Sequence, residues 1–335
     1  MRTNLIEGAK PELPVFRDLD NSYYLRHEAG RLLVGAFEPD GLPRPLTEIS
    51  DTGFAEFGAD WDHFVPIRTQ VEKTIAAIGG AGYDRFLNAP ESFTPDANFT
   101  LGETGEVAGL FVAAGMNSQG IIFAPGIGRE LASWIISGVP QFDAADVDVR
   151  RFAANQANRR FLHDRTKEGL GRLYAMHWPQ LQMSTGRGVR RSPLHERLSA
   201  MGAAFGELNG WERANWYAEP GTTPFHEYSY DRPNWFDQVK AEHDAAREGV
   251  VLFDLSSFAK IEVAGPEALN VVQLAFTANM DVEIDKSVYT LQLNEAGGIE
   301  LDGTVTRVAA DRFLVVTPSA TLHKTLSILE RLATG

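Results

Sequence analysis

The chain has 335 residues, no cysteine and a net charge of −14, from 31 Lys and Arg against 45 Asp and Glu. Without cysteine, disulfides, thiolate catalysis and Cys-ligated metal sites are excluded. Nucleic-acid binding needs clustered Lys and Arg, and the short cluster Arg187, Arg190 and Arg191 does not offset the acidic excess. No apolar run reaches the ~20 residues that span a bilayer. We therefore expect neither a nucleic-acid nor a membrane partner.

The first part of the chain predicts a hairpin followed by a helix. Residues 23–26 and 31–37 are β-prone and are separated by a short segment that contains Gly30, which is typical of a β-hairpin. From about residue 62, apolar side chains recur every three to four residues as far as Ile78, and this spacing indicates a helix. We expect Gly79 and Gly80 to end that helix.

Residues 110–128 form the strongest local signal in the sequence. Leu110–Ala114 is a short apolar run typical of a buried strand, the glycine-rich stretch 115–128 follows it, and a helix is expected from near Arg129. Glycine permits close backbone approach, and a helix N-terminus presents free N–H groups, so this order suits a cradle for a polar ligand edge. The alternative is an ordinary strand–turn–helix whose glycines serve packing alone.

The second part predicts a polar linking region and then a new unit of helices and strands. Residues 139–193 are rich in Arg, His and Gln, with helical spacing over 161–174, and 211–233 reads as an aromatic loop. We expect helices over 235–248, from Pro266 and at the end of the chain, and strands over 250–254, 260–264, 288–293, 304–308 and 313–316. The fold class is therefore α+β (mixed α/β).

Three side chains are candidates for chemistry, each with a plainer alternative. Strand alternation places Tyr24 and Arg26 on one face, where a hydroxyl and a guanidinium could position a carboxylate substrate, although a half-exposed sheet face explains them as well. Asp302 enters a strand after a Gly-Gly turn, where it could accept a hydrogen bond from a ligand nitrogen or be a solvated turn residue. The histidines are scattered without metal-ligand spacing, so we expect no metal site.

Seven stretches in this order resemble the sarcosine dehydrogenase and dimethylglycine dehydrogenase family. That family fuses a D-amino-acid-oxidase-type flavoprotein to a glycine-cleavage T-protein-like aminomethyltransferase module. The resemblance covers nearly the whole chain and looks nearer to sarcosine dehydrogenase. The matching stretches are residues 13–28, 90–96, 115–120, 190–195, 210–216, 251–256 and 289–302.

The resemblance implies two cofactors, FAD and tetrahydrofolate, and a division of the chain. Residues 1–139 resemble the C-terminal part of the flavin domain, 140–197 a central connecting subdomain, and 198–335 the N-terminal part of the folate-binding domain. By this match, Tyr24 faces the substrate amine and Asp302 orients the folate ring nitrogens. The implied flavin-binding residues are Gly115, Met116, Asn117, Ser118, Gln119, Gly120, Ile121, Pro125 and Gly126.

The implied reaction is oxidation of a small N-methylated amino acid, sarcosine or dimethylglycine, followed by capture of the one-carbon unit by tetrahydrofolate. A nearby folate would trap the reactive iminium before it hydrolyses. Relatives that use oxygen directly carry a Lys after the glycine-rich turn, where this chain has Ile122, which favours a dehydrogenase with an electron-acceptor protein. The GxGxxG unit and the His that carries flavin in this family are missing. We therefore expect a fragment, or a partner polypeptide that supplies the FAD-binding unit.

Two other hypotheses remain. A non-catalytic regulatory subunit with the same two-module architecture is the main alternative. A pure folate-binding aminomethyltransferase is disfavoured, because roughly the first 140 residues match the flavin half. Met1 to Lys10 show no signal or transit pattern. The family implies a cytoplasmic location in a bacterium and the mitochondrial matrix in a eukaryote.

Overall fold

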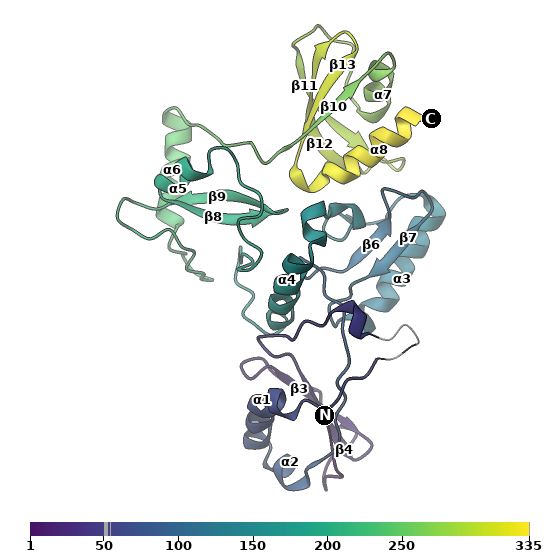
Figure 1. Ribbon diagram of the computed structural model, residues 1–335, viewed down its shortest axis with the longest axis vertical. Coiled ribbons are helices and arrows are strands. Elements are labelled where there is room, and N and C mark those ends of the chain that lie inside the picture. Colours follow the sequence, from purple (N-terminus) through teal and green to yellow (C-terminus); the bar gives the residue numbers. More distant parts are fainter. Residues whose placement is uncertain (50–52, 54, 335) are drawn as a thin grey trace. The chain divides into compact units, whose positions relative to one another are not determined.

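The computed structural model describes residues 1–49, 53 and 55–334. The chain divides into two compact units, which are described separately. The first comprises Met1–Ala97 and Leu162–His177, and the second comprises Asn98–Phe161 and Trp178–Gly335. Helices and strands are mixed throughout, which confirms the expected fold class (Figure 1).

The first unit is built on an antiparallel five-stranded sheet in the order β2-β3-β4-β1-β5. The strands are β1 (Arg2–Thr3), β2 (Phe16–Asp18), β3 (Tyr23–Glu28), β4 (Arg31–Ala36) and β5 (Tyr83–Arg85). The expected hairpin is confirmed as β3–β4, in which Glu28 pairs with Arg31. Its two loop residues, Ala29 and Gly30, have φ angles of 47° and 77°, the conformation that tight hairpin turns require.

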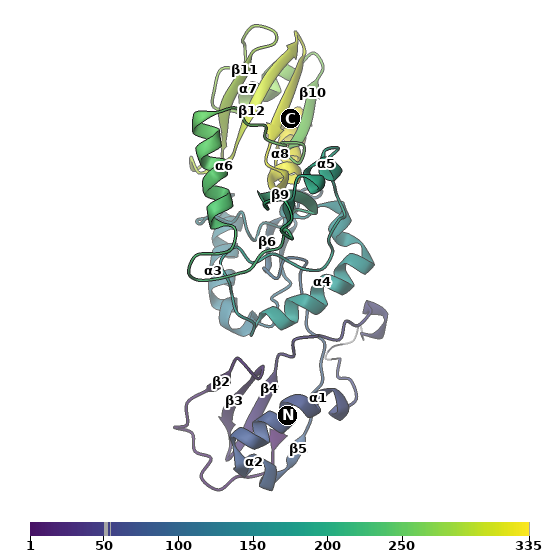
Figure 2. The same cartoon turned by 90° about the vertical axis from the view of Figure 1, so that its left-hand side faces the viewer.

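Helices α1 (Trp61–Thr74) and α2 (Ala76–Ala81) lie beside this sheet (Figure 2). The predicted helical segment is present, but it is divided at Ile75 into two helices. Gly79 and Gly80 lie inside α2, whose C-cap is Gly82 with a φ of 69°. Ile78 is fully buried, and its packing against the sheet outweighs the modest cost of glycine in a helix. The buried cluster contains Tyr23, Leu25, Leu32 and Val34 of the sheet and Phe64, Ile67, Val71 and Ile78 of the helices.

The glycine-rich region of the second unit folds differently from the expectation. The strand is present as β7 (Phe111–Ala114), paired with β6 (Thr100–Glu103), but α3 spans Gly120–Ser137 and does not wait for Arg129. The chain turns within residues 115–119, and the buried positions Ile127 and Trp134, two helical turns apart, lie on one face of α3. The glycines in 120–128 are therefore helical, because the buried face of α3 already includes Ile127, which precedes the predicted helix start near Arg129.

The remaining elements of the second unit form a hairpin and a four-stranded sheet. Strands β8 (Ala203–Leu208) and β9 (Trp211–Tyr217) pair, so the predicted aromatic loop begins as a strand. Residues 250–254 form no strand, since this apolar run has no neighbouring strand to pair with. Three helices border these sheets: α5 (His195–Ala200), α6 (Phe236–Glu248) and α7 (Ala268–Ala275). The larger sheet has the order β10-β13-β12-β11, with β10 (Ala259–Ala264), β11 (Ser287–Leu293), β12 (Ile299–Ala309) and β13 (Arg312–Thr317).

Helix α8 (Leu322–Thr334) packs on the four-stranded sheet and also reaches a buried ionic group, the Asp148 cluster, which consists of Asp148, Arg150, Glu300 and Lys324. Asp148 is 2% exposed; Arg150 Nη2 donates to its Oδ2 at 2.7 Å, and Lys324 Nζ lies 3.7 Å away. Burial alone would raise the pKa of Asp148, but the hydrogen bonds from Arg150 and the charges of Arg150 and Lys324 outweigh it and lower that pKa. The cluster joins the turn η2 (Val149–Arg151) to α8.

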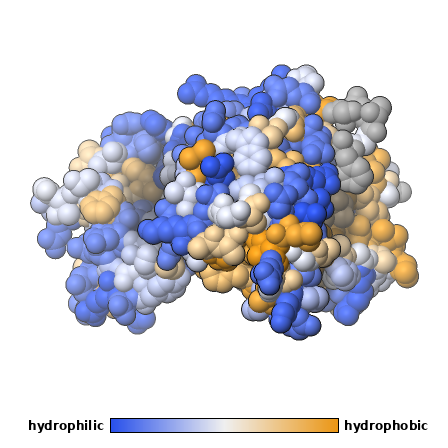
Figure 3. Space-filling view, turned by 90° about the horizontal axis from the view of Figure 1, so that it is seen from below, coloured by the Kyte–Doolittle hydropathy of each residue, from blue (hydrophilic) through white to orange (hydrophobic). Residues whose placement is uncertain are grey.

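Among the described residues, no helix is both long and apolar enough to cross a membrane. Hydrophilic residues cover much of the face seen in Figure 3, with apolar residues between them.

Candidate functional site

Tyr24 lies at the centre of a row of three residues that face one another across strands β2, β3 and β4. Arg17 pairs with Tyr24, and Tyr24 pairs with Gly35. Because side chains alternate along a strand, this row faces away from the buried side chains of Tyr23 and Leu25. A Cβ added at Gly35 would lie 1.9 Å from Tyr24 Cε1, so glycine is what allows the tyrosine ring to lie across β4.

Two more aromatic rings complete this face. Phe37 follows β4, and its ring centroid is 6.0 Å from that of Tyr24 and 4.8 Å from that of Tyr174, on which it stacks. Tyr174 follows helix α4 (Arg159–Arg172) and accepts a hydrogen bond from Arg17 Nε at 3.1 Å. Strand alternation could have placed Phe37 beside Tyr24. No local signal could have placed Tyr174, which is 157 residues from Arg17.

The pKa of the Tyr24 hydroxyl is raised above its ordinary value. Burial is the main cause; Arg26 opposes it, while Tyr174 and Glu91 add to it. The hydroxyl therefore stays protonated at neutral pH, so it is available as a hydrogen-bonding group and not as a base. The predicted neighbour Arg26 is on the same face, but its Nη2 donates to Glu28 Oε1 at 3.0 Å. Its charge is thus already balanced.

The predicted flavin segment lies in the second unit and combines a left-handed loop with a helix N-terminus. Gly115, Asn117 and Ser118 have φ angles of 65°, 48° and 62°, and Asn117, which is 2% exposed, donates from Nδ2 to the carbonyl of Gly115 at 2.5 Å. Helix α3 begins two residues later, at Gly120, without a side-chain cap and without an acidic residue in its first turn. An N-terminus of this kind favours a carbonyl or anionic oxygen of a ligand. These features fit a flavin edge.

The individual residues predicted for flavin binding divide between these two elements. Gly115, Met116, Asn117, Ser118 and Gln119 form the loop and the helix cap, whereas Gly120, Ile121, Pro125 and Gly126 lie within α3. The prediction of a ligand-binding loop that continues through residue 126 is therefore wrong. Ile121 is 97% exposed and Ile122 is 76% exposed, so this end of α3 presents an apolar surface.

Asp302 lies on β12 and is joined by a residue that the sequence reasoning did not select. Tyr289 of β11 donates from its hydroxyl to Asp302 Oδ2 at 3.0 Å. Both side chains are exposed on the same face of the sheet. Asp302 pairs directly with Leu291, and Tyr289 lies two residues before Leu291 on β11, so the tyrosine and the carboxylate are diagonal neighbours. The hydrogen bond to Asp302, followed by desolvation and the carboxylate charge, raises the pKa of Tyr289, so its hydroxyl remains a donor. A carboxylate held open in this way fits the N–H groups of a pterin ring.

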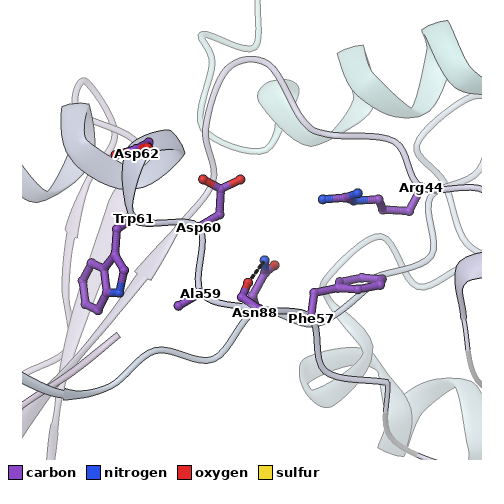
Figure 4. Close-up of a pocket in the computed structure, with 8 residues that line it drawn as sticks. Arg44, Phe57, Ala59, Asp60, Trp61, Asp62 and Asn88 are labelled. Atoms are coloured by element: carbon purple, nitrogen blue, oxygen red, sulfur yellow. Dashed lines mark hydrogen bonds between the residues drawn. The ribbon is translucent and has the colours of Figure 1, made fainter.

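Two cavities in the described part of the chain lie apart from the predicted residues. An open cavity of about 570 Å³ in the first unit is lined by Arg44, Phe57, Asp60 and Asn88, among others (Figure 4). Asp60 caps α1 through the backbone N–H of His63, so its carboxylate serves the helix. A cavity of about 320 Å³ in the second unit lies beside the ion pair of Arg187 and Glu212.

Comparison with known families matches three consecutive segments. Residues 2–134 match FAD dependent oxidoreductase, 137–192 match the FAD dependent oxidoreductase central domain, and 194–334 match the GCVT N-terminal domain. The chain is thus an FAD-dependent oxidoreductase segment followed by an aminomethyltransferase-like domain. The chain is similar to proteins named sarcosine dehydrogenase and dimethylglycine dehydrogenase, in agreement with the resemblance seen in the sequence.

The individual relatives carry the names of different activities. The chain is 70% identical over its whole length to 4-methylaminobutanoate oxidase (formaldehyde-forming) of Paenarthrobacter nicotinovorans, of which it covers 41%. It is 34% identical over 92% of its length to human mitochondrial sarcosine dehydrogenase, of which it covers 36%. It is also 34% identical over 91% of its length to the mouse mitochondrial pyruvate dehydrogenase phosphatase regulatory subunit, of which it covers 35%. The chain therefore spans between about a third and two fifths of the length of these relatives.

Proposed function

We propose that the protein carrying this chain oxidises the N-methyl group of a small amino acid with FAD, and that its substrate is 4-methylaminobutanoate. The support for the reaction class is the row of Arg17, Tyr24 and Gly35, which presents a protonated hydroxyl and a guanidinium on one face of the sheet. The support for this substrate over sarcosine or dimethylglycine is the 70% identity to the Paenarthrobacter relative.

In the proposed reaction, the chain's own residues bind and orient the amine. The bound FAD supplies a hydride acceptor. Loss of hydride from the methyl carbon of R–NH–CH3 gives the iminium R–NH⁺=CH2, and water converts it to R–NH3⁺ and formaldehyde. The Tyr24 hydroxyl orients the nitrogen, and the ring that lies over Gly35 excludes water from that side. The segment from Gly115 to Gly120 would hold the polar edge of the cofactor.

We further propose that the pair of Tyr289 and Asp302 binds the pterin ring of tetrahydrofolate, which captures the one-carbon unit. The support is the open carboxylate fixed by the tyrosine hydroxyl at 3.0 Å in a GCVT-type domain. A carboxylate that accepts two N–H bonds recognises such a ring well. The formaldehyde named for the Paenarthrobacter relative is what the iminium releases when no folate traps it.

The electron acceptor is a separate question. Ile122 led us to expect a dehydrogenase, whereas the Paenarthrobacter relative is named an oxidase. We propose dioxygen as the acceptor, on the strength of that identity. Oxygen consumption measured with a substrate-reduced enzyme tests this directly, and reoxidation that is slow in air but fast with an artificial acceptor would restore the dehydrogenase prediction.

The test of the main proposal uses the natural full-length polypeptide loaded with FAD. Initial rates with 4-methylaminobutanoate, sarcosine and dimethylglycine should rank 4-methylaminobutanoate first in kcat/KM. Y24F should reduce kcat/KM at least tenfold, while Y289F should leave amine oxidation unchanged and shift the product from methylenetetrahydrofolate toward formaldehyde. No oxidation of any of the three amines would contradict the proposal and favour a regulatory role like that named for the mouse relative.

A further inference from the structure

We infer that Arg17, and not Arg26, binds the substrate carboxylate, and that Tyr174 holds the Arg17 side chain in place for this task. The inference rests on the proposed function, because it assigns the carboxylate subsite of the same site. It starts from strand pairing. Arg17 lies directly opposite Tyr24 across β2 and β3, on the face that carries the tyrosine hydroxyl.

The guanidinium of Arg17 is fixed at one nitrogen and open at the others. Its Nε donates to the Tyr174 hydroxyl at 3.1 Å, and its Cζ lies 4.6 Å from the centroid of the Tyr174 ring. Among the described residues, no carboxylate forms an ion pair with Arg17. Its two terminal nitrogens are therefore left for a ligand. Two parallel N–H groups of this kind match a carboxylate.

Tyr174 can hold Arg17 because the tyrosine itself is buried. Its side chain is 5% exposed and stacks on Phe37 at a ring separation of 4.8 Å and an interplanar angle of 17°. Phe37 in turn contacts Tyr24. The three rings form one surface, the aromatic wall, which connects the hydroxyl that orients the nitrogen to the cation that would bind the carboxylate. A zwitterion with a methylammonium group at one end suits this wall, because cations are attracted to ring faces.

Arg26 is the competing assignment and fits less well. It lies two residues from Tyr24 on the same strand, but its guanidinium is bound to Glu28 at 3.0 Å. Glu28 also lies 3.8 Å from Arg2. Binding a substrate carboxylate there would require breaking an existing pair, whereas Arg17 needs no rearrangement.

The arrangement of Arg17 and the rings suits a zwitterion. Arg17 of β2 lies directly opposite Tyr24 of β3. A carboxylate beside Arg17 would meet the opposite charge, and a cationic nitrogen beside Tyr24 would lie against the aromatic wall. The substrate class is therefore a methylamino acid whose amine and carboxylate are separated along the aromatic wall.

The test measures binding without turnover. The probe is 4-(trimethylammonio)butanoate, whose quaternary nitrogen has no lone pair, so loss of hydride cannot form an iminium. Its partner probe is butyltrimethylammonium, which keeps the cation and lacks the carboxylate. Calorimetry on the FAD-loaded full-length protein gives Kd for both, and circular dichroism melting verifies that each variant is folded.

The wild type should bind 4-(trimethylammonio)butanoate more tightly than butyltrimethylammonium. R17Q should weaken binding of the carboxylate probe by about 10- to 100-fold, the range expected for a charged bidentate pair, and should leave binding of butyltrimethylammonium unchanged. Y174F should weaken binding of the carboxylate probe by about 3- to 10-fold, because the Arg17 guanidinium loses the hydroxyl that accepts from its Nε. In turnover, R17Q should raise KM far more than it lowers kcat. R85Q, at a half-exposed arginine paired to Glu56, is the matched control and should match the wild type.

Two results would overturn the inference. One is equal affinity of the wild type for the two probes. The other is a loss in R26Q that equals or exceeds the loss in R17Q. Both can occur while the wild type oxidises 4-methylaminobutanoate, so they refute the carboxylate assignment and leave the proposed function standing. A wild type that oxidises none of the amines refutes the function itself.

Discussion

Replacing Asp148 by Asn should destabilise the second unit by about 3 kcal/mol. The change removes one negative charge from the Asp148 cluster and almost no volume. Arg150 and Lys324, whose side chains are 10% and 12% exposed, then lose a partner at 2.7 Å and 3.7 Å. Breaking a buried ion pair on one side costs about 3–5 kcal/mol. The lower end applies here, because Lys324 keeps Glu300 and an amide oxygen can still accept from the backbone N–H of Arg150.

Urea unfolding followed by tryptophan fluorescence measures this loss. Five of the six tryptophans lie in the second unit, and W61F removes the sixth. With an m-value of about 3 kcal/mol/M, the midpoint should fall by about 1 M. D311N, at an exposed carboxylate, is the matched control and should change the free energy of unfolding by less than about 0.5 kcal/mol.

The pH dependence gives an independent check. The pKa of Asp148 is lower in the folded chain than in the unfolded chain, so the unfolded state binds more protons in acid. The stability from Asp148 is thus fully present above its unfolded pKa of about 3.9 and is lost as the pH falls toward its folded pKa. D148N should lack this part of the acid loss. A cost below about 1 kcal/mol, or an acid profile identical to that of the wild type, would refute the reasoning.

Three further predictions concern single positions. G35A should displace the Tyr24 ring, because its Cβ would lie 1.9 Å from that ring, and should destabilise the first unit by about 1–3 kcal/mol in thermal melts. The control G80A has open space in α2 and should be neutral or up to about 1 kcal/mol stabilising. N117A should cost about 1–3 kcal/mol in urea unfolding, since a buried side chain loses its bond to the backbone while φ stays at 48°. I121S should change stability by less than about 0.5 kcal/mol and reduce light scattering, because Ile121 is 97% exposed; a larger loss would show that this side chain is covered.

The sequence predicts those features that depend on neighbouring residues. The β3–β4 hairpin follows from β-prone runs separated by a short segment containing Gly30, and α1 follows from its apolar spacing. The start of α3 was misplaced because glycines read as loop residues, while the buried positions Ile127 and Trp134 extend the helix through them. Residues 250–254 have strand-like composition, and only tertiary structure shows that no partner strand is present.

The candidate site divides in the same way. Motifs in the sequence indicate Tyr24 and Asp302, and Tyr289 lies within a matching stretch, although only the strand pairing shows that its hydroxyl reaches Asp302. Arg17 and Tyr174 could not be found, because one depends on strand register and the other on a contact across 157 residues. Arg26 was preferred on alternation alone, which cannot show that Glu28 already pairs with it.

The contacts that α8 makes have a consequence for synthesis on the ribosome. Arg331 of α8 binds Glu103 of β6 at 2.8 Å, across 228 residues of chain. At roughly 5–20 residues per second, the earlier segment waits on the order of 10–50 s for its partner to be made. During that time Asp148 lacks Lys324, and the surface that α8 will cover is open. Until α8 emerges, the nascent second unit therefore exposes this surface to solvent, and truncation before Lys324 should destabilise the earlier segment, because Asp148 loses Lys324 and Glu103 loses Arg331.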